Sequence, residues 1–190
     1  MSQEIEIEYK NLLTREEFNR ILTHLPFTEQ GKTQINYYFE TTQFSLKKNG
    51  CALRIREKYD KYNLTLKEPH PEGLLETHDT LTKQEALDWI QGKNVAKKHT
   101  TKQLTAMNIS PMDLIYYGNL TTERRELEYG NVLVVLDYST YNGKADYELE
   151  IEAPSEAIGI QAFDDLLKQF QIPKRDTPNK IKRFFQSAQT

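Results

Sequence analysis

Hydrophobic and charged residues alternate strictly in two segments of the chain, one near each end. The first runs from Glu4 to Lys10 and the second from Ala145 to Glu152. Because successive side chains of a β-strand point to opposite faces, this alternation predicts two strands, each with an apolar face and a charged face. The acids expected to share the charged faces are Glu4, Glu6 and Glu8 in the first strand, and Glu148, Glu150 and Glu152 in the second.

Six further segments are expected to be strands, the first of them because it is rich in β-branched and aromatic residues. They cover 35–39, 51–56, 63–67, 74–80, 120–128 and 132–138. Asn-Gly pairs at 49–50 and 142–143 are typical of hairpin turns, which indicates antiparallel pairing. We interpret Glu68–Gly73, which contains two prolines, as a loop. The chain therefore predicts eight strands.

Helical periodicity with a clear start signal appears four times. The predicted N-caps are hydroxyl side chains: Thr14, Thr82, Ser155 and Thr177. A glutamate three residues after each of the first two completes a capping box, and Pro178 suits the first helical position after Thr177. The stretch 93–117 is expected to hold short helical pieces.

These elements predict an α+β fold dominated by β structure, organised as a single domain over residues 1–190. Eight antiparallel strands are enough to close into a barrel, which would remove exposed sheet edges. The apolar strand faces need cover, which the amphipathic helices can supply. The charged faces are then left together, directed either toward water or toward the inside of the barrel.

The net charge and the cysteine content limit the kinds of binding partner and the cellular compartment that we expect. The net charge is −3, with 28% charged residues and no basic excess, so neither nucleic acid nor a membrane surface is indicated as a partner. Cys51 is the single cysteine, which excludes an intrachain disulfide and fits a cytoplasmic protein. The first residues lack the features of a signal peptide, and no apolar stretch is long enough to span a bilayer.

The remaining candidate residues have ordinary interpretations. Histidines at four positions show no metal-ligand spacing, and we interpret them as surface or incidental: His24, His70, His78 and His99. Trp89 is expected in the core, and Cys51 is expected to be a small packed side chain rather than a nucleophile.

Acidic and basic residues are segregated by strand. Glutamates dominate the first and last predicted strands, whereas Arg54 and Arg56 share a face of one middle strand and Lys67 lies on the next. A sheet face that is merely solvated remains the alternative, but such faces usually mix charges of both signs. A site that binds a divalent metal on carboxylates and phosphate on guanidinium and ammonium groups needs this segregation.

The residues on these strands resemble the CYTH, or triphosphate tunnel metalloenzyme, superfamily. Residues Glu6–Lys10 match its E-x-E-x-K signature. Further matching segments follow in order along nearly the whole chain: Asn36–Phe39, Leu53–Arg56, Leu64–Lys67, Glu76, Arg124-Arg125, Asp137, Tyr147–Glu150 and Asn179–Phe184. The chain is most similar to the YjbK-like branch of Gram-positive bacteria. The resemblance implies a closed eight-stranded antiparallel β-barrel, open as a charged tunnel, with helices packed around it.

The superfamily includes inorganic, thiamine and RNA triphosphatases and class IV adenylyl cyclases. The resemblance therefore implies a metal-dependent hydrolase that acts on a small-molecule triphosphate, with Mg²⁺ or Mn²⁺ as cofactor. Other activities of the superfamily remain open, namely adenylyl cyclase and thiamine triphosphatase. Outside catalysis, the chain could be a polyphosphate- or nucleotide-binding module, or a barrel whose charged interior is purely structural.

The resemblance also implies roles for individual residues. The expected metal ligands are Glu6, Glu8, Glu76, Asp137, Glu148 and Glu150. The expected phosphate-binding residues are Lys10, Arg54, Arg56, Lys67, Arg124, Lys180 and Arg183. Lys10, Glu148 and Glu150 are the expected catalytic residues. Arg124 is preferred over Arg125 because its neighbours on the same strand face are polar.

Overall fold

The computed structural model describes residues 2–27 and 30–188, which fall into two compact units. Among these residues, unit 1 consists of 2–5 and 34–120, and unit 2 consists of 6–27, 30–33 and 121–188. Each unit has its own hydrophobic core. The single domain predicted over 1–190 stays a prediction, and its residues 1, 28, 29, 189 and 190 lie outside the described residues.

Unit 1 is built on a sheet with the hydrogen-bonded order β1-β6-β5-β4-β3-β7. The strands are β1 (Gln3–Glu6), β3 (Lys32–Thr41), β4 (Ala52–Lys58), β5 (Lys61–His70), β6 (Gly73–Leu81) and β7 (Leu114–Tyr129). Strands β3 to β6 pair antiparallel along the chain order, in a register that sets Lys67 opposite Glu76 and Thr65 opposite His78. This register places Thr65, Lys67, Glu76 and His78 on one face.

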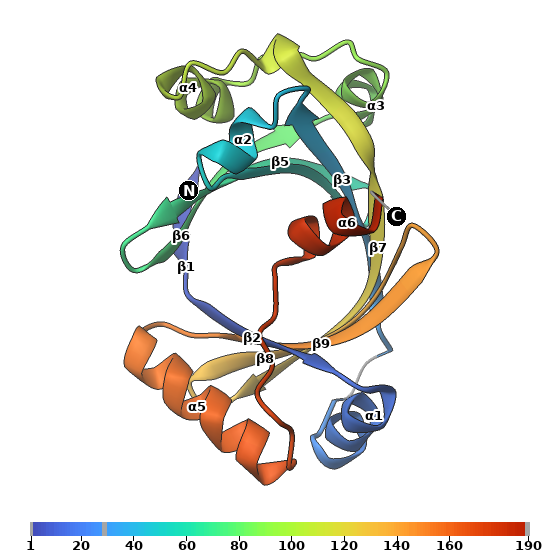
Figure 1. Ribbon diagram of the computed structural model, residues 1–190, viewed down its shortest axis with the longest axis vertical. Coiled ribbons are helices and arrows are strands. Elements are labelled where there is room, and N and C mark those ends of the chain that lie inside the picture. The colour runs from blue at the N-terminus through green and yellow to red at the C-terminus, as the bar shows by residue number, and fades with distance from the viewer. Residues whose placement is uncertain (1, 28–29, 189–190) are drawn as a thin grey trace. The chain divides into compact units, whose positions relative to one another are not determined.

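Helices cover the other face of this sheet. They are α2 (Ser45–Lys48), α3 (Lys83–Ile90) and α4 (Lys98–Ala106), followed by the short 3₁₀ helix η1 (Pro111–Asp113). Figure 1 shows α3 and α4 on the same side of β5 and β6. Phe39, Trp89 and Leu104 are fully buried between the layers, which confirms the core position predicted for Trp89.

Unit 2 continues from β7 in the order β7-β8-β9-β2. Its further strands are β2 (Glu8–Leu13), β8 (Val132–Tyr141) and β9 (Lys144–Glu152). Helices α1 (Arg15–His24) and α5 (Glu156–Gln169) pack on the apolar face, where Leu149 and Ile151 meet Phe18 and Phe163. Helix α6 (Lys180–Ala188) lies on the opposite, charged face of the same strands (Figure 1).

The predicted α+β fold dominated by β structure is confirmed, but the closed eight-stranded barrel is not. The described residues form nine strands, and their hydrogen-bonded order has two ends, β1 and β2. The strand predicted over Glu4–Lys10 is interrupted at Ile7, so that its first part pairs with β6 and its second part with β9. One predicted strand therefore supplies both ends of the order.

Helix starts follow the predicted caps in three of four cases. Thr14 and Thr82 form complete capping boxes, and the Ser155 side chain caps α5. The cap predicted at Thr177 is wrong, because α6 begins at Lys180 and the Asn179 side chain accepts a hydrogen bond from the backbone N–H of residue 182. The Thr177 hydroxyl instead accepts a hydrogen bond from the backbone of β2.

Two predicted connections also differ from the structure. Asn49-Gly50 does not form a hairpin turn; it ends α2, and Gly50 adopts a positive φ of 70° that suits a residue without a Cβ. The predicted loop 68–73 is mostly strand, with Pro69 opposite Leu74. Pro69 is tolerated because the ladder with β4 ends at Lys67, so no partner on that side needs its missing N–H.

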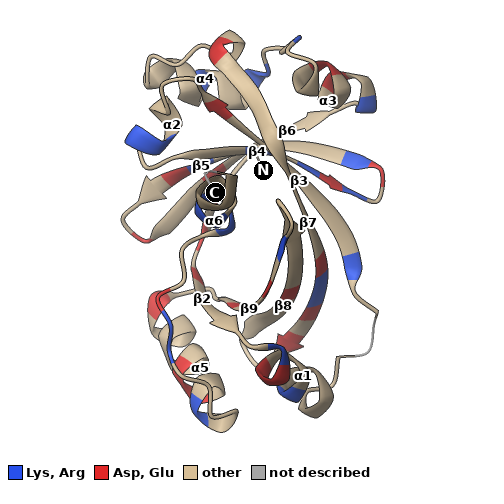
Figure 2. Cartoon of the chain, turned by 45° about the vertical axis from the view of Figure 1, so that its right-hand side comes forward, with Lys and Arg blue, Asp and Glu red and all other residues tan. Residues whose placement is uncertain are grey.

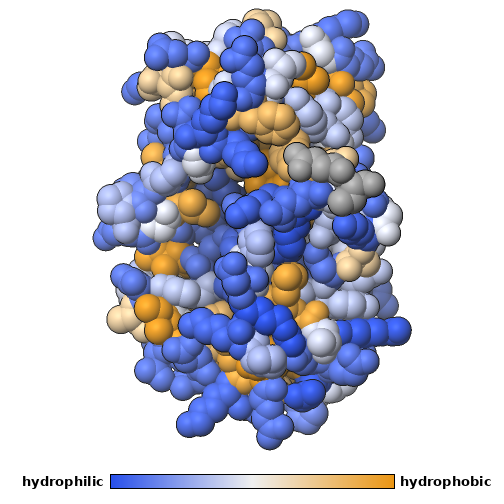
Figure 3. Space-filling view, in the orientation of Figure 1, coloured by the Kyte–Doolittle hydropathy of each residue, from blue (hydrophilic) through white to orange (hydrophobic). Residues whose placement is uncertain are grey.

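Neither the helices nor the face shown in Figure 3 is strongly hydrophobic. No helix among the described residues is long and apolar enough to cross a membrane. The face shown in Figure 3 is mostly hydrophilic, with its hydrophobic residues in separate groups.

The stretch 93–117 contains α4 and η1, as predicted, but β7 already begins at Leu114.

Candidate active site

The charged face of unit 2 gathers three buried carboxylates, which we call the acidic triad: Asp137, Glu148 and Glu150. Asp137 on β8 and Glu148 on β9 are register partners, and Glu150 lies two residues further on the same face of β9. Their exposed fractions are 0%, 1% and 5%. One oxygen of each lies within 4.8 Å of the others, so the three side chains converge on a common position.

An ammonium group occupies that position. Lys180 is the first residue of α6, and its Nζ lies 2.9 Å from Asp137 Oδ2 and 2.6 Å from Glu148 Oε1, and also forms an ion pair with Glu150. Burial opposes the charged form of this lysine, but the three carboxylates outweigh burial and hold the pKa of Lys180 well above its usual value. The triad therefore binds a cation in the folded chain.

Two arginines complete the network. Arg124 on β7 donates Nε and Nη2 to Asp137 at 2.8 and 2.7 Å, and Nη2 also contacts Glu150 at 2.6 Å. Arg183 on α6 forms an ion pair with Glu148 and donates to Asp146 at 3.1 Å. Burial opposes ionisation of both arginines, yet the neighbouring carboxylates raise the pKa of each.

The neighbouring arginine on β7 does not join this network. Arg125 instead pairs with Glu123 at 2.6 Å, on the opposite face of the strand. The structure therefore places Arg124 beside the triad, on the face that its polar strand neighbours indicated. Figure 2 shows basic and acidic positions close together along β7 and β8.

The pKa values of the two glutamates of the triad are shifted in opposite directions. Burial raises the pKa of Glu148, and repulsion from Glu150 adds to this, against the opposing effect of Lys180. Burial acts in the same direction on Glu150, but Lys180 and Arg124 outweigh it and hold the pKa of Glu150 well below its usual value. Environments that separate the pKa values of two adjacent acids are typical of acid–base sites.

Strand β2 adds a second row of charges to the same face. Its register places Lys10 opposite Glu150 and Glu8 opposite Glu152. Lys10 Nζ donates to Glu8 Oε1 at 2.7 Å. Burial, followed by the charges of nearby acids that include Glu6 and Glu8, raises the pKa of Glu152 to about 7.

The donor set of the triad suits a hard divalent cation. Its ligands are carboxylate oxygens alone, which Mg²⁺ and Mn²⁺ prefer over nitrogen or sulfur. Their convergence on the Lys180 ammonium shows that a positive charge fits there. The residues of unit 2 therefore fit the metal that the sequence implies.

Unit 1 carries a different charged cluster around a single buried acid. Glu76 on β6 is 4% exposed, and its Oε1 lies 2.6 Å from Lys67 Nζ and 3.6 Å from Arg54 Nη2. Burial opposes ionisation of Glu76, but His78, Arg54 and Lys67 together hold its pKa well below the usual value. The third predicted phosphate-binding residue of this unit, Arg56, donates to Asn36 at 3.1 Å.

The sequence interpretation of His78 as incidental is wrong. Its Nε2 lies 3.0 Å from Glu4 Oε1 and 3.3 Å from Glu76 Oε2, and its Nδ1 is 3.0 Å from Thr65 Oγ1. The hydrogen bond with Glu76 is the largest effect that raises the pKa of His78. The spacing of Glu76 and His78, two residues apart in a strand, was the available signal, because it places both side chains on one face.

Cys51 has no catalytic environment. The thiol lies 3.6 Å from Met107 Sδ, and burial raises the pKa of Cys51 to about 11, so that little of it is thiolate near neutral pH. This agrees with the packed role predicted from the sequence.

Comparisons with known proteins identify relatives of the whole chain. A profile of the CYTH domain matches residues 4–185. A protein of Bacillus subtilis (strain 168) named "Putative triphosphatase YjbK" is 49% identical over 187 residues, which cover 98% of this chain and 97% of that protein. The match extends across the segments of both units.

Solved structures share the fold of this chain. A crystal structure from Bacillus halodurans, described as a "putative adenylate cyclase", is 43% identical with a TM-score of 0.93, and the match covers 97% of this chain and all of that one. The Hippeastrum protein HpAC1, described as a "putative adenylyl cyclase" that "reveals a dominant triphophatase activity", shares the fold with a TM-score of 0.78 at 22% identity, over 96% of each chain.

Proposed function

The chain belongs to the CYTH domain family, and from this premise we propose that it is a metal-dependent hydrolase of a small-molecule triphosphate. The observation that carries the proposal is the acidic triad, in which Asp137, Glu148 and Glu150 converge on one cation position. The description of the Bacillus subtilis relative as a triphosphatase supports the same reaction class.

In this proposal the acidic triad, with Glu6 and Glu8, holds Mg²⁺ or Mn²⁺. The ion supplies charge neutralisation and orientation of phosphate oxygens. Lys180 and Arg183, which contact the carboxylates of the triad, would bind phosphate oxygens of the substrate. Together with Arg124 and Lys10 they stabilise the charge that develops on the transferring phosphoryl group and the departing phosphate.

Glu148 is proposed as the general base. A water attacks phosphorus in line, the new P–O bond forms as the phosphoanhydride bond breaks, and the water proton passes to a carboxylate. The raised pKa of Glu148 suits proton acceptance near neutral pH, whereas the lowered pKa of Glu150 keeps that carboxylate ionised. Glu150 is therefore assigned to the metal alone, whereas Glu148 is a metal ligand that also accepts the proton of the water.

A substrate panel tests this proposal. Phosphate release is measured from inorganic triphosphate, ATP and thiamine triphosphate, with Mg²⁺ or Mn²⁺. Glu148→Gln is expected to lower kcat by about 10²–10⁴-fold, the range of a lost general base. The exposed Glu128→Gln on β7 is the control and should leave kcat unchanged.

Different outcomes select different functions. Cyclic nucleotide with pyrophosphate would instead make the chain a cyclase, in line with the description of the Bacillus halodurans structure. Tight triphosphate binding without products would leave a binding module. If no triphosphate binds in a metal-dependent manner, the proposal fails.

The basic residues of unit 1 are proposed as phosphate ligands in their own right. Lys67 and Arg54 approach the same oxygen of Glu76, so more than one cation is available per buried acid. Substitution of Lys67 or Arg54 by Met should raise KM for the triphosphate, with Arg56→Met showing the same direction. A change confined to kcat would contradict a binding role.

A further inference from the structure

We propose that Glu4, Glu76 and His78 of unit 1 form a binding site for a divalent transition metal, with Zn²⁺ as the best-suited ion. The imidazole nitrogen distinguishes this group from the acidic triad of unit 2, whose ligands are all carboxylate oxygens. One ligand atom from each of the three residues lies within 4.8 Å of the others. The inference concerns a second metal site and does not depend on triphosphate hydrolysis.

The distances from His78 to its two carboxylate neighbours suit a tetrahedral site. Metal–ligand bonds of about 2.0–2.2 Å in tetrahedral geometry place neighbouring ligand atoms roughly 3.4 Å apart. His78 Nε2 lies 3.0 Å from Glu4 Oε1 and 3.3 Å from Glu76 Oε2. A small movement of Glu4, whose side chain is 63% exposed, is enough to open the space that an ion needs.

The imidazole ring is already oriented for metal binding. Thr65 Oγ1 lies 3.0 Å from His78 Nδ1 and can accept a hydrogen bond from Nδ1–H, which leaves Nε2 to face the two carboxylates. A hydroxyl, carbonyl or carboxylate on the second ring nitrogen is the usual support of a metal-binding histidine. Thr65 is buried and lies opposite His78 in the β5–β6 ladder, so its position is set by the sheet.

The two carboxylate oxygens of Glu76 have different partners. Oε1 faces Lys67 and Arg54, whereas Oε2 faces His78. The cations keep the carboxylate ionised and do not occupy the oxygen that would bind metal. They also lower the affinity for a dication by repulsion, so this site needs the stronger bond that a transition metal forms with imidazole.

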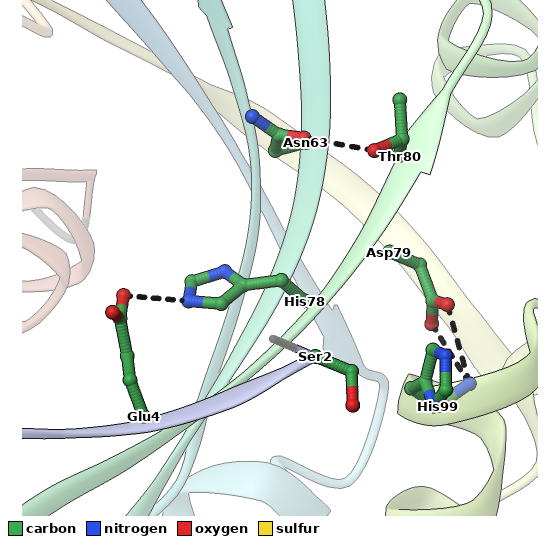
Figure 4. A pocket seen from close by; sticks show the side chains of 7 residues that line it. All are labelled: Ser2, Glu4, Asn63, His78, Asp79, Thr80 and His99. Carbon is green, nitrogen blue, oxygen red and sulfur yellow. Dashed lines mark hydrogen bonds and ion pairs between the residues drawn. The ribbon is translucent and has the colours of Figure 1, made fainter.

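Strand β1 brings the third ligand to the site. The backbone N–H of His78 donates to Ser2 O at 2.7 Å, and the Gln3 side chain donates to Thr77 Oγ1 at 3.0 Å. These bonds hold β1 along β6, and the Glu4 carboxylate then points at the His78 ring (Figure 4). The interruption at Ile7 thus separates Glu4 from the acids of β2 and gives it a different role.

The site opens on a pocket of about 560 Å³. Glu4 and His78 form part of its wall, and Figure 4 also shows the other residues that line it: Ser2, Asn63, Asp79, Thr80 and His99. Three protein ligands that leave a fourth position toward an open space are the arrangement of zinc sites that bind water or a substrate group. The fourth ligand is therefore expected to be exchangeable.

Histidine nitrogen resonances test the proposal in the unmodified chain. Zn²⁺ is added to the full-length protein at mildly alkaline pH, and long-range ¹H–¹⁵N spectra report the ring nitrogens of the four histidines. We expect a stoichiometric amount of Zn²⁺ to shift Nε2 of His78, which the His78→Gln spectrum identifies. An Nε2 resonance that does not move, or a shift only at another histidine, overturns the proposal.

Affinity measurements sharpen the test. With a chromophoric chelator as competitor, His78→Gln should weaken Zn²⁺ binding by at least about tenfold, and Thr65→Val, which removes the support of the ring, by about 10–100-fold. His99→Gln is the matched control, because His99 lines the same pocket outside the ligand group, and it should change the affinity less than twofold. Equal Zn²⁺ affinity in His78→Gln and wild type contradicts the site.

A separate ion reports on the acidic triad. Binding of Mn²⁺, followed by its electron paramagnetic resonance signal, should be weakened by Glu150→Gln and retained in His78→Gln. The two measurements are therefore independent: a lack of Zn²⁺ binding at His78 would not change Mn²⁺ binding to the triad, and a lack of Mn²⁺ binding would not change Zn²⁺ binding.

Discussion

In unit 2 three buried carboxylates share three cations, whereas in unit 1 one buried carboxylate, Glu76, is surrounded by two cations and a histidine. The acids of unit 2 depend on each other's partners, since Arg124 contacts both Asp137 and Glu150. In unit 1 the contacts of Glu76 are divided between its two oxygens. The contrast indicates that the acids of unit 2 converge on one cation position, whereas Glu76 of unit 1 holds its basic partners and its histidine on different oxygens.

Removal of one basic side chain should lower the free energy of unfolding most in unit 2. Arg124→Met leaves two buried acids short of a partner, and breaking a buried ion pair in this way costs about 3–5 kcal/mol of unfolding free energy. Arg125→Met is the matched control on the adjacent residue, where the side chain of the partner Glu123 is 44% exposed and the expected loss is below about 1 kcal/mol. Denaturant unfolding measures both. Equal losses would contradict the network described for unit 2.

The corresponding test in unit 1 is Glu76→Gln. We expect a loss of about 2 kcal/mol in the free energy of unfolding, because the charged contacts of Glu76 with Lys67 and His78 disappear while the cations remain. The pKa of His78 should fall, since Glu76 is the main cause of its rise. A raised histidine pKa stabilises the fold at low pH and loses that effect as pH rises through it, so the deficit should be larger on the acid side.

Two measurements check this prediction. Proton NMR titration gives the His78 pKa in both proteins, and unfolding at several pH values gives the deficit. The exposed Glu72→Gln on the same hairpin is the control. An unchanged His78 pKa in Glu76→Gln would mean that Glu4 alone sets its protonation.

Glu152 offers a smaller, pH-dependent test of unit 2. Its pKa rises from 4.5 to about 7 on folding, so the folded chain binds this proton more tightly and becomes less stable as pH rises between those values. Glu152→Gln should therefore be more stable than wild type above pH 7, by on the order of 1 kcal/mol, with no difference below pH 4.5. Metal-free unfolding curves across this range provide the test. A constant difference at all pH values would exclude Glu152 as the titrating group.

The smallest effect is expected at the start of α6, which carries Lys180 and Arg183 to the triad. Asn179→Ala removes the capping oxygen and should cost about 1 kcal/mol, whereas Asn179→Asp keeps one and should cost less. Thermal unfolding in the absence of metal compares the two variants. If both lose the same stability, the Asn179 side chain does not cap the helix.

Local sequence patterns predicted the helix starts whose capping donor and acceptor lie within a few residues of each other. The capping boxes at Thr14 and Thr82 formed because the donor and acceptor are three residues apart in the same turn. Thr177 and Asn179 are both able to cap a helix, and the choice between them was made by a distant strand, since the Thr177 hydroxyl bonds to the backbone at Leu12. A local pattern contains no information on that partner.

The same distinction applies to the charged residues. Strand parity was enough to place Glu148 and Glu150 on one face and to favour Arg124 over Arg125. It could not show that His78 joins Glu4 and Glu76, because Glu4 comes from a strand 74 residues away in sequence. The interruption at Ile7, which assigns Glu4 and Glu8 to different units, was equally invisible in an unbroken alternating pattern.

The sequence by itself determined the β-dominated architecture, the amphipathic faces, most helix starts and membership of a family, since each depends on the order and type of residues. The tertiary structure alone decided which acids are buried together, which cation neutralises each, and which proton affinities result. Those properties arise from desolvation and from charges within a few ångströms, and such neighbours are supplied by strand register and by Lys180 at the far end of the chain.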